Sequence, residues 1–319
     1  MTTKPVLGIS GCLTGSAVRF DGGHKRMGFG MDELAQWVAF RPVCPEMAIG
    51  LPTPRPALRL VMTTGGETEM RFSKAPHDDV TQKMAAFTAD YLPKIGDLAG
   101  FIVCAKSPSC GMERVRLYDE NGNRGRKEGV GLFTAALLET FPWLPVEEDG
   151  RLHDPVLREN FVERVFALHE LNVMRKNGLT RRALLDFHSR YKLQLLAHHQ
   201  AGYREIGPFV ASLHEWDDLD AFFVAYRDKL MTILKKPASR KNHTNVLMHI
   251  QGYFRNQLNS LQRGELRDVT LHYRDGLLPI LAPLTLLKHY LAEYPDRYLM
   301  TQNYFDPYPD DLGLRLAVT

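Results

Sequence analysis

Three of the four cysteines in this 319-residue chain follow a short apolar run and stand in a turn of glycine, proline or serine. The runs and their cysteines are Val6–Ser10 with Cys12, Trp37–Phe40 with Cys44, and Phe101–Ala105 with Cys110. A short apolar run bounded by turn residues is typical of a buried strand. In an open parallel sheet the carboxyl ends of the strands share one edge, where ligands bind. We therefore expect these cysteines, distant in the sequence, to meet at one edge of a sheet.

Three thiolates at one point are typical of a metal or an iron–sulfur cluster. A structural zinc site normally has four ligands, so three cysteines leave one coordination position open. A [4Fe–4S] cluster on three thiolates would have one iron free to act as a Lewis acid on a soft, sulfur-bearing group. The alternative is that each cysteine is a small buried hydrophobe. Cys104 lies inside an apolar run, so we expect it in the core.

Polar residues accompany two of these cysteines. Glu46 follows Cys44 by two residues, and a carboxylate beside a buried cluster can serve as the general base or acid for a water. The alternative for Glu46 is a solvated surface position. Ser107 and Ser109 precede Cys110, and we expect them either to donate hydrogen bonds to sulfur or substrate, or to stabilise the turn.

The composition indicates the cellular compartment in which such a chain functions. The sequence has no apolar run of about 18 residues, so we expect no membrane-spanning helix. Its first residues lack a long apolar segment, so no signal peptide is expected. Four cysteines are too few for a secreted disulfide scaffold. We expect a cytoplasmic protein, because thiols stay reduced there and clustered cysteines bind metal.

Residues 1–150 alternate short apolar runs with helical stretches, which predicts an α/β domain with a mostly parallel sheet. Glycines 65 and 66 stand between two short apolar runs, which is typical of a hairpin. Prolines, a charge run and a glycine in residues 141–150 predict a linker. The expected helices are Asp32–Trp37, Asp78–Tyr91 and Leu132–Thr140.

Residues 151–319 predict an all-α domain. Apolar residues recur there at spacings of three and four, the period of a helix that is buried on one side. The expected helices are Pro155–Lys176, Arg181–His199, Leu219–Lys235, Asn242–Leu258, Leu266–Arg274 and Pro283–Ala292.

The charge of the chain is uneven. Residues 1–150 hold 17 Lys and Arg against 18 Asp and Glu, whereas residues 181–260 hold 12 against 7. The nearly neutral first part has little with which to hold a polyanion, and the basic second part favours a nucleic acid partner. The alternative is a solvated charged face. We expect phosphate contacts and base stacking from His188, Arg190, Tyr191, Lys192, Lys235, Lys236, Arg240, Lys241 and His243.

Sequence motifs add a resemblance to known families. Ser10–Leu13, Arg19–Gly22, Cys44–Glu46, Gly50–Arg55 and Ser107–Gly111 resemble the thiouracil desulfidase family. Phe187–Lys192, Asn242–His249 and Leu299–Tyr304 resemble the helical YbgA-type domain, which is often fused to the first. Together the two matches cover nearly the whole chain.

This resemblance implies a [4Fe–4S] cluster on Cys12, Cys44 and Cys110, with the family's acidic residue at Glu46 and its serine at Ser107. The fused form resembles the desulfidase that converts 4-thiouridine in tRNA to uridine. The implied reaction is not a redox reaction: water replaces sulfur, and hydrogen sulfide leaves. The expected partner is therefore tRNA that contains 4-thiouridine.

Two alternatives remain at this point. One is an enzyme that desulfurates free thiouracil, with another role for the helical domain. The other is an RNA-binding protein whose cluster is structural or senses redox conditions. Release of sulfide separates an enzyme from a binding protein, and activity on tRNA against the free base separates the two enzymes.

Overall fold

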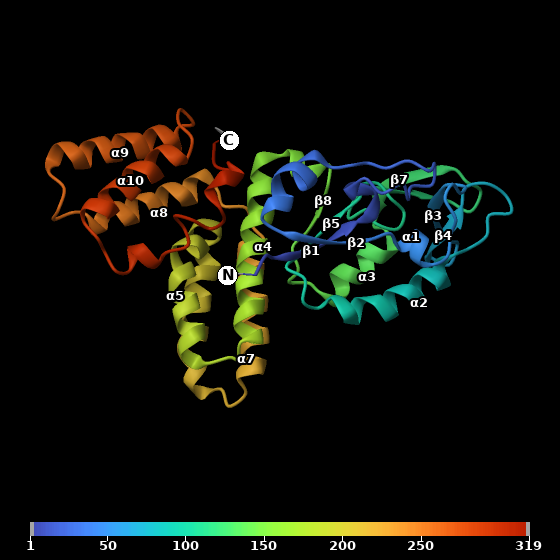
Figure 1. Ribbon diagram of the computed structural model, residues 1–319, viewed down its shortest axis with the longest axis horizontal. Coiled ribbons are helices and arrows are strands. Elements are labelled where there is room, and N and C mark those ends of the chain that lie inside the picture. The colour runs from blue at the N-terminus through green and yellow to red at the C-terminus, as the bar shows by residue number, and fades with distance from the viewer. Residues whose placement is uncertain (1–2, 317–319) are drawn as a thin grey trace. The chain divides into compact units, whose positions relative to one another are not determined.

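A computed structural model describes residues 3–316, apart from the side chain of Arg124, and the chain divides into two compact units (Figure 1). The first unit is Met1–His153 and the second is Asp154–Thr319. The first unit combines strands and helices, and the described part of the second is helical. This confirms the fold class expected from the sequence.

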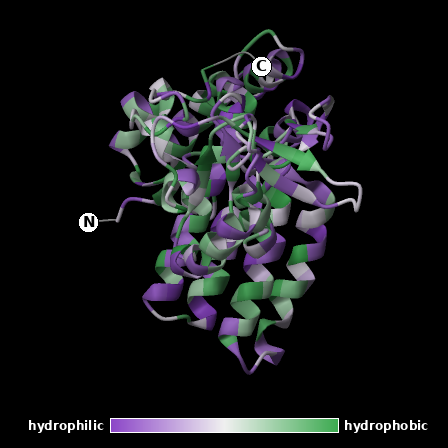
Figure 2. Ribbon diagram, turned by 90° about the vertical axis from the view of Figure 1, so that its right-hand side faces the viewer, coloured by the Kyte–Doolittle hydropathy of each residue, from purple (hydrophilic) through white to green (hydrophobic). Residues whose placement is uncertain are grey.

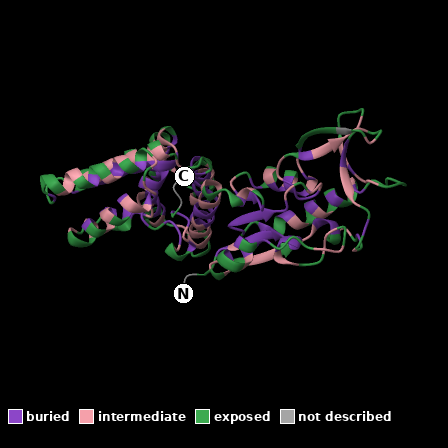
Figure 3. Cartoon of the chain, turned by 90° about the horizontal axis from the view of Figure 1, so that it is seen from above, coloured by how far each residue is buried: buried purple, intermediate pink, exposed green. Residues whose placement is uncertain are grey.

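A fully parallel sheet, sheet A, forms the centre of the first unit. Its strand order is β2-β1-β5-β8. The inner strands β1 and β5 are almost wholly buried, as Figure 3 shows, which fits their continuous apolar runs. The strands are β1 (Val6–Ser10), β2 (Ala39–Val43), β5 (Gly100–Val103) and β8 (Val146–Glu148).

The expectation of a linker at residues 141–150 is wrong, because β8 lies there and pairs with β5. Its acidic side chains are buried, and each has a partner. Glu147 accepts a hydrogen bond from Nε of Arg151 at 2.6 Å, and Glu148 accepts one from the backbone N–H of Met112 at 2.8 Å. Burial of a carboxylate is tolerated only when it is paired in this way. The pairing comes from elsewhere in the fold, so the local sequence looks like a polar linker.

A second sheet, sheet B, has the strand order β4-β3-β6-β7. Its first two strands form the expected hairpin, and Gly66 in the turn has a φ of 83°, which favours glycine. β3 pairs in parallel with β6, which pairs antiparallel with β7. The strands are β3 (Leu58–Met62), β4 (Thr68–Phe72), β6 (Val115–Tyr118) and β7 (Arg124–Gly129).

Helices α2 (Thr81–Tyr91) and α3 (Leu132–Thr140) lie side by side in the first unit (Figure 1). Phe133 of α3 packs against Phe101 of β5, with the ring centroids 5.6 Å apart. The first unit also contains the short helix α1 (Pro45–Ala48). The expected helix Asp32–Trp37 is instead two short irregular turns, Phe29–Glu33 and Leu34–Gln36.

The second unit is built from helices that carry both apolar and hydrophilic residues along their length (Figure 2). No strand occurs in residues 154–316. All six expected helices are present: α4 has the expected ends, the other five have shifted ends, and α6 is an addition that the sequence did not predict. The helices are α4 (Pro155–Lys176), α5 (Arg181–His198), α6 (Gln200–Ala211), α7 (Leu219–Leu234), α8 (Arg240–Tyr253), α9 (Ser260–Arg274) and α10 (Leu281–Glu293).

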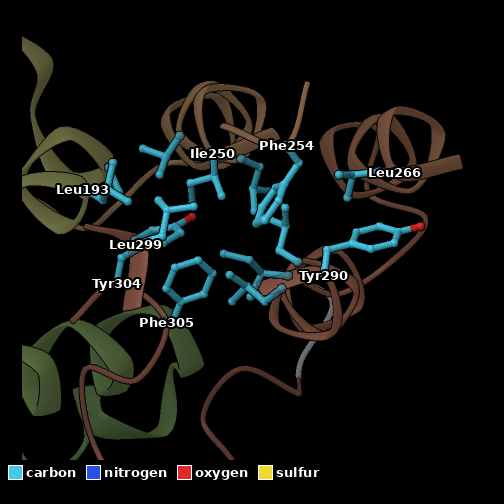
Figure 4. Packing of buried hydrophobic residues seen from close by; sticks show 14 of the residues in the cluster. Leu193, Ile250, Phe254, Leu266, Tyr290, Leu299, Tyr304 and Phe305 are labelled. Carbon is cyan, nitrogen blue, oxygen red and sulfur yellow. The ribbon is translucent and has the colours of Figure 1, made fainter. Parts of the chain in front are cut away.

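A hydrophobic cluster holds α5, α8, α9 and α10 together (Figure 4). Leu193 of α5, Ile250 of α8 and Leu266 of α9 belong to it, together with Tyr304 near the C-terminal end. Burial of such side chains provides the main drive for packing helices. Within the described residues, no helix is both long and apolar enough to cross a membrane.

Candidate active site

The structure brings all the cysteines of the chain to one cavity of about 420 Å³. Cys12 lies in the turn after β1, Cys44 follows β2, and Cys110 lies in the turn that follows β5. The expected meeting of these three residues at the carboxyl edge of the parallel sheet is thus observed. Their role as cluster ligands stays a prediction.

Cys104 is buried in the core, as expected from its apolar neighbours. β5 ends at Val103, and Cys104 is the first residue beyond it. Its backbone N–H donates to Oγ of Ser10 at 3.0 Å, and its thiol borders the same cavity as the other cysteines. The apolar run continues past the strand end, so hydrophobicity alone did not reveal where the strand stops.

Burial and mutual contact shift the pKa values of these thiols. Burial raises the pKa of Cys44, and raises that of Cys110 to about 12. A hydrogen bond between Cys12 and Cys104 raises the pKa of Cys12 and lowers that of Cys104. Cys12, Cys44 and Cys110 therefore favour the protonated form, and a metal that binds them must displace protons.

The donor set fits a cluster better than a single ion. Among the described residues, no three His, Cys, Asp or Glu side chains converge on one metal ion. The thiols instead surround a cavity, which suits a polynuclear group with thiolates on separate corners. Thiolates are also the ligands that iron–sulfur clusters prefer.

Glu46 is buried beside the thiols, so the alternative of a solvated surface glutamate is excluded. It lies in the first turn of α1, directly after Cys44 and Pro45. Nε and Nη2 of Arg55 both donate to Oε2 of Glu46, at 3.0 and 2.6 Å. The guanidinium compensates the buried carboxylate and fixes its plane.

Arg55 is a site residue that sequence reasoning missed. Its guanidinium also donates to the carbonyls of Pro52 and Val18, at 3.1 and 3.0 Å, which joins the loop after α1 to the loop after β1. Arg55 is the last residue of the motif Gly50–Arg55, so the sequence did mark it as a family residue. The motif alone does not show that the arginine turns inward onto Glu46.

Two serines extend this network. Oγ of Ser109 donates to Oε1 of Glu46 at 2.7 Å, and Oγ of Ser107 lies 3.0 Å from Oγ of Ser109. A hydroxyl has one proton, so when Ser109 donates to Glu46, the hydrogen between the serines comes from Ser107. Ser109 is 1% exposed and borders the cavity, and its Oγ also lies 3.6 Å from Sγ of Cys110, so a contact of this hydroxyl with sulfur is observed and a contact with substrate stays a prediction.

Helix α3 fixes the turn that carries these serines. The N–H groups of Leu132 and Phe133 donate to the carbonyls of Pro108 and Ser109, at 3.1 and 3.0 Å. This pairs donors that are otherwise free at a helix start. Gly131 allows the close approach, because a Cβ there would lie 2.5 Å from the carbonyl carbon of Ser109.

Cations and an aromatic ring border the cavity. Nζ of Lys25 lies 2.6 Å from Asp149, whose other oxygen accepts from the N–H of Ala105. Burial acts to lower the pKa of Lys25, but the hydrogen bond to Asp149 and the attraction of nearby negative charges together raise that pKa. Phe20 is 42% exposed, so its ring is accessible to a planar ligand.

The helical unit corrects part of the expected RNA contacts. The expectation of base stacking is wrong for His188, Tyr191 and His243, because all three are buried in the fold. His188 and His243 each bond a tyrosine hydroxyl, of Tyr226 and Tyr304. Partners on other helices make this burial possible, and a local pattern of basic and aromatic residues does not show them.

The basic residues of the helical unit have mixed positions. Arg190 pairs with Glu170, and Lys192 is half-buried. Arg240 donates to the carbonyl of Tyr273 at 2.6 Å. The exposed residues of the set are Lys235, Lys236 and Lys241.

The chain matches two family models. Residues 7–149 match 2-thiouracil desulfurase, and residues 192–309 match a family of proteins of unknown function, DUF1722. One relative is the uncharacterized protein YbgA of Escherichia coli (strain K12), which is 51% identical over 152 residues, or 48% of this chain and 90% of YbgA. The chain belongs to the YbgA family and carries a 2-thiouracil desulfurase domain.

A solved structure is also similar to part of this YbgA-family chain. It is described as the [4Fe-4S]-dependent thiouracil desulfidase TudS, with 30% identity and a TM-score of 0.38, over 50% of this chain and 100% of TudS. The cluster expected from the sequence is the cofactor named for that relative. The family matches confirm the resemblance that the motifs carried, and the desulfurase domain supports a thiouracil desulfidase.

Proposed function

We propose that this protein is a desulfidase that uses a [4Fe–4S] cluster to convert 4-thiouridine in tRNA to uridine. The observation that carries the proposal is the meeting of three thiols, Glu46 and Ser107 around one cavity of a 2-thiouracil desulfurase domain. Cys12, Cys44 and Cys110 would hold the cluster. When bound on three thiolates, the cluster supplies an open Lewis acid for a thiocarbonyl sulfur.

The residues of the chain supply the proton transfers. Oε2 of Glu46 is held twice by Arg55, so Oε1 is the oxygen with capacity to take a proton from water. The hydroxide adds to the carbon that carries sulfur, and the carbon–sulfur bond then breaks. Once Glu46 carries the proton, both serine hydroxyls must rotate so that Glu46 donates to Ser109 and Ser109 donates to Ser107; the proton can then pass to Ser107, which borders the cavity. Water and the thiocarbonyl become a carbonyl and hydrogen sulfide, with no change in oxidation state.

The exposed lysines of the helical unit support a tRNA substrate. Lys235, Lys236 and Lys241 lie within a few residues of each other, around the start of α8. Exposed cations of this kind bind phosphate without regard to base sequence. The YbgA domain would then hold the RNA, and the desulfurase domain would act on the thiolated base.

The proposal is tested by incubating the protein, purified and reconstituted without oxygen, with tRNA that contains 4-thiouridine. The tRNA is then digested to nucleosides, and sulfide in the medium is measured. We expect 4-thiouridine to fall as uridine and sulfide rise. Sulfide from free 4-thiouracil alone would favour the free-base enzyme, and no sulfide from either substrate would favour the binding protein.

A further inference from the structure

A groove on sheet B opens directly beside the thiol cavity. It has a volume of about 370 Å³ and shares four bordering residues with the cavity, so the two adjoin within the first unit. The shared residues are Ala57, Leu58, Lys106 and Pro108.

The groove is positively charged. Arg59 on β3, Arg116 on β6 and Lys106 after β5 border it, and none of the described residues along it is Asp or Glu. The first unit as a whole is nearly neutral, with 17 Lys and Arg against 18 Asp and Glu in residues 1–150. The fold therefore gathers cations at this groove although this part of the chain is nearly neutral as a whole.

The guanidinium of Arg59 is held in a position that suits ligand binding. Its guanidinium lies over the ring of Tyr118, 5.4 Å from the centroid, and this contact holds the planar group in place. Its Nε is buried and has no hydrogen-bond partner. A buried donor without a partner costs free energy, so the structure itself does not satisfy all the hydrogen-bonding capacity of this guanidinium.

Lys106 links the groove to the cavity. It is exposed, and its φ of 65° is rare for a residue other than glycine. Such a conformation is strained and is concentrated at functional sites. The residue stands between Cys104 and Ser107, so a chain of phosphates along the groove would lead to the reactive cavity.

We propose that this groove binds the sugar–phosphate backbone of RNA next to the thiolated nucleotide. Arg59, Arg116 and Lys106 contact phosphate oxygens, while the thiolated base enters the thiol cavity. The inference rests on the proposed function, and it adds a second RNA contact, within the desulfurase domain itself. The ligand is a polynucleotide, because a free base has no phosphate to place in the groove.

The test measures RNA binding directly, without turnover. A fluorescein-labelled trinucleotide with 4-thiouridine at its centre is titrated with the full-length protein, and anisotropy is read at several salt concentrations. The variant is Arg59→Gln with Arg116→Gln. The matched control is Arg126→Gln, an exposed arginine on β7 of the same sheet that does not border the groove.

The double variant is expected to bind the trinucleotide roughly 10-fold more weakly than the wild type, because charge-assisted contacts are lost. The slope of log affinity against log salt should also fall by about 1 for each phosphate contact removed. The control should match the wild type in both. Equal affinity and slope in the double variant and the control would overturn the proposal.

Two further arms keep the result unambiguous. Circular dichroism checks the fold, and if the double variant is unfolded, Lys106→Gln, a change at an exposed side chain, takes its place with the same expected direction.

Competition identifies the ligand chemistry. The two competitors are an unlabelled trinucleotide without sulfur, and inorganic phosphate. Competition by the trinucleotide at micromolar concentration but by phosphate only at millimolar concentration supports the backbone site, and equal competition contradicts it. Absence of sulfide release in any assay would refute the proposed function while leaving this binding result to stand or fall separately.

Discussion

Glu46 is the residue on which the proposed chemistry depends. Its carboxylate is buried, held by Arg55 on one oxygen and by Ser109 on the other, beside the thiols. A carboxylate so fixed pays little reorganisation when it takes a proton from water. The same contacts explain the short motif of Cys44, Pro45 and Glu46. The thiol at the end of β2 and the carboxylate in the first turn of α1 must both face the cavity.

Replacing Glu46 with Gln should remove the base while keeping its shape and its contact with Ser109. We expect the cluster to assemble normally and turnover of thiolated tRNA to fall by roughly 100-fold or more, the usual contribution of a general base. Iron content, visible absorption and sulfide release are measured on the same anaerobic sample. Near-normal turnover in a cluster-replete Glu46→Gln protein would remove Glu46 from the mechanism.

Strand ends explain what could be predicted at the scale of elements. The positions of Cys12, Cys44 and Cys110 followed from apolar runs that stop at turns, because a parallel sheet aligns its strand ends. Cys104 is buried as expected, but its position at the thiol cavity was not predicted, because the apolar run continues past the end of its strand. β8 was misread because Glu147 and Glu148 are paired by residues that the local pattern does not contain.

The helices show the same limit. Their apolar periodicity predicted six of them, since packing on one face is recorded in the sequence. The burial of His188 and His243 was not predicted, because it depends on tyrosines from other helices or from the C-terminal segment. Their environment has a measurable consequence for stability.

Burial lowers the pKa of His188 to about 4, well below its usual value near 6.5, and Lys192 adds to the effect. The folded protein therefore favours neutral His188, and this contribution to stability is present above pH 6.5 and lost as the pH falls toward 4. At pH 4 the loss amounts to about 3 kcal/mol. The helical unit should unfold at lower urea concentration at pH 4.5 than at pH 7.

The variant His188→Asn keeps a polar partner for Tyr226 but does not titrate in this range. Its urea midpoint should depend less steeply on pH than that of the wild type between pH 4.5 and 7. Unfolding is followed by circular dichroism at about 222 nm, which reports helix content, and the free energy of unfolding is calculated from that curve. Identical pH dependence in the two proteins would show that His188 does not stay neutral in the folded state.

At the scale of the whole molecule, one domain carries the chemistry and the other is proposed to add affinity for tRNA. The exposed lysines of the YbgA domain, Lys235, Lys236 and Lys241, are the cations best placed to contact phosphates there. Arg240 is less suited to charge reversal, because it bonds the carbonyl of Tyr273.

Reversal of the three lysines to glutamate should weaken tRNA binding and reduce its dependence on salt, because each phosphate contact releases counterions. A slope smaller by about 1 for each lost contact is expected in anisotropy titrations with intact tRNA. A control reverses Lys176 and Arg182, which are also exposed in this unit. Unchanged affinity in the triple variant at two salt concentrations would identify the lysines as a solvated face.

The central claim is that the cavity at the edge of sheet A is a cluster site held by three particular thiols. The most direct measurement compares Cys12→Ala, Cys44→Ala, Cys110→Ala and Cys104→Ala after anaerobic reconstitution, by iron content, acid-labile sulfide and visible absorption. We expect loss of the cluster in the first three variants and its retention in Cys104→Ala. Full cluster content in any of the first three, or loss in Cys104→Ala alone, would contradict it.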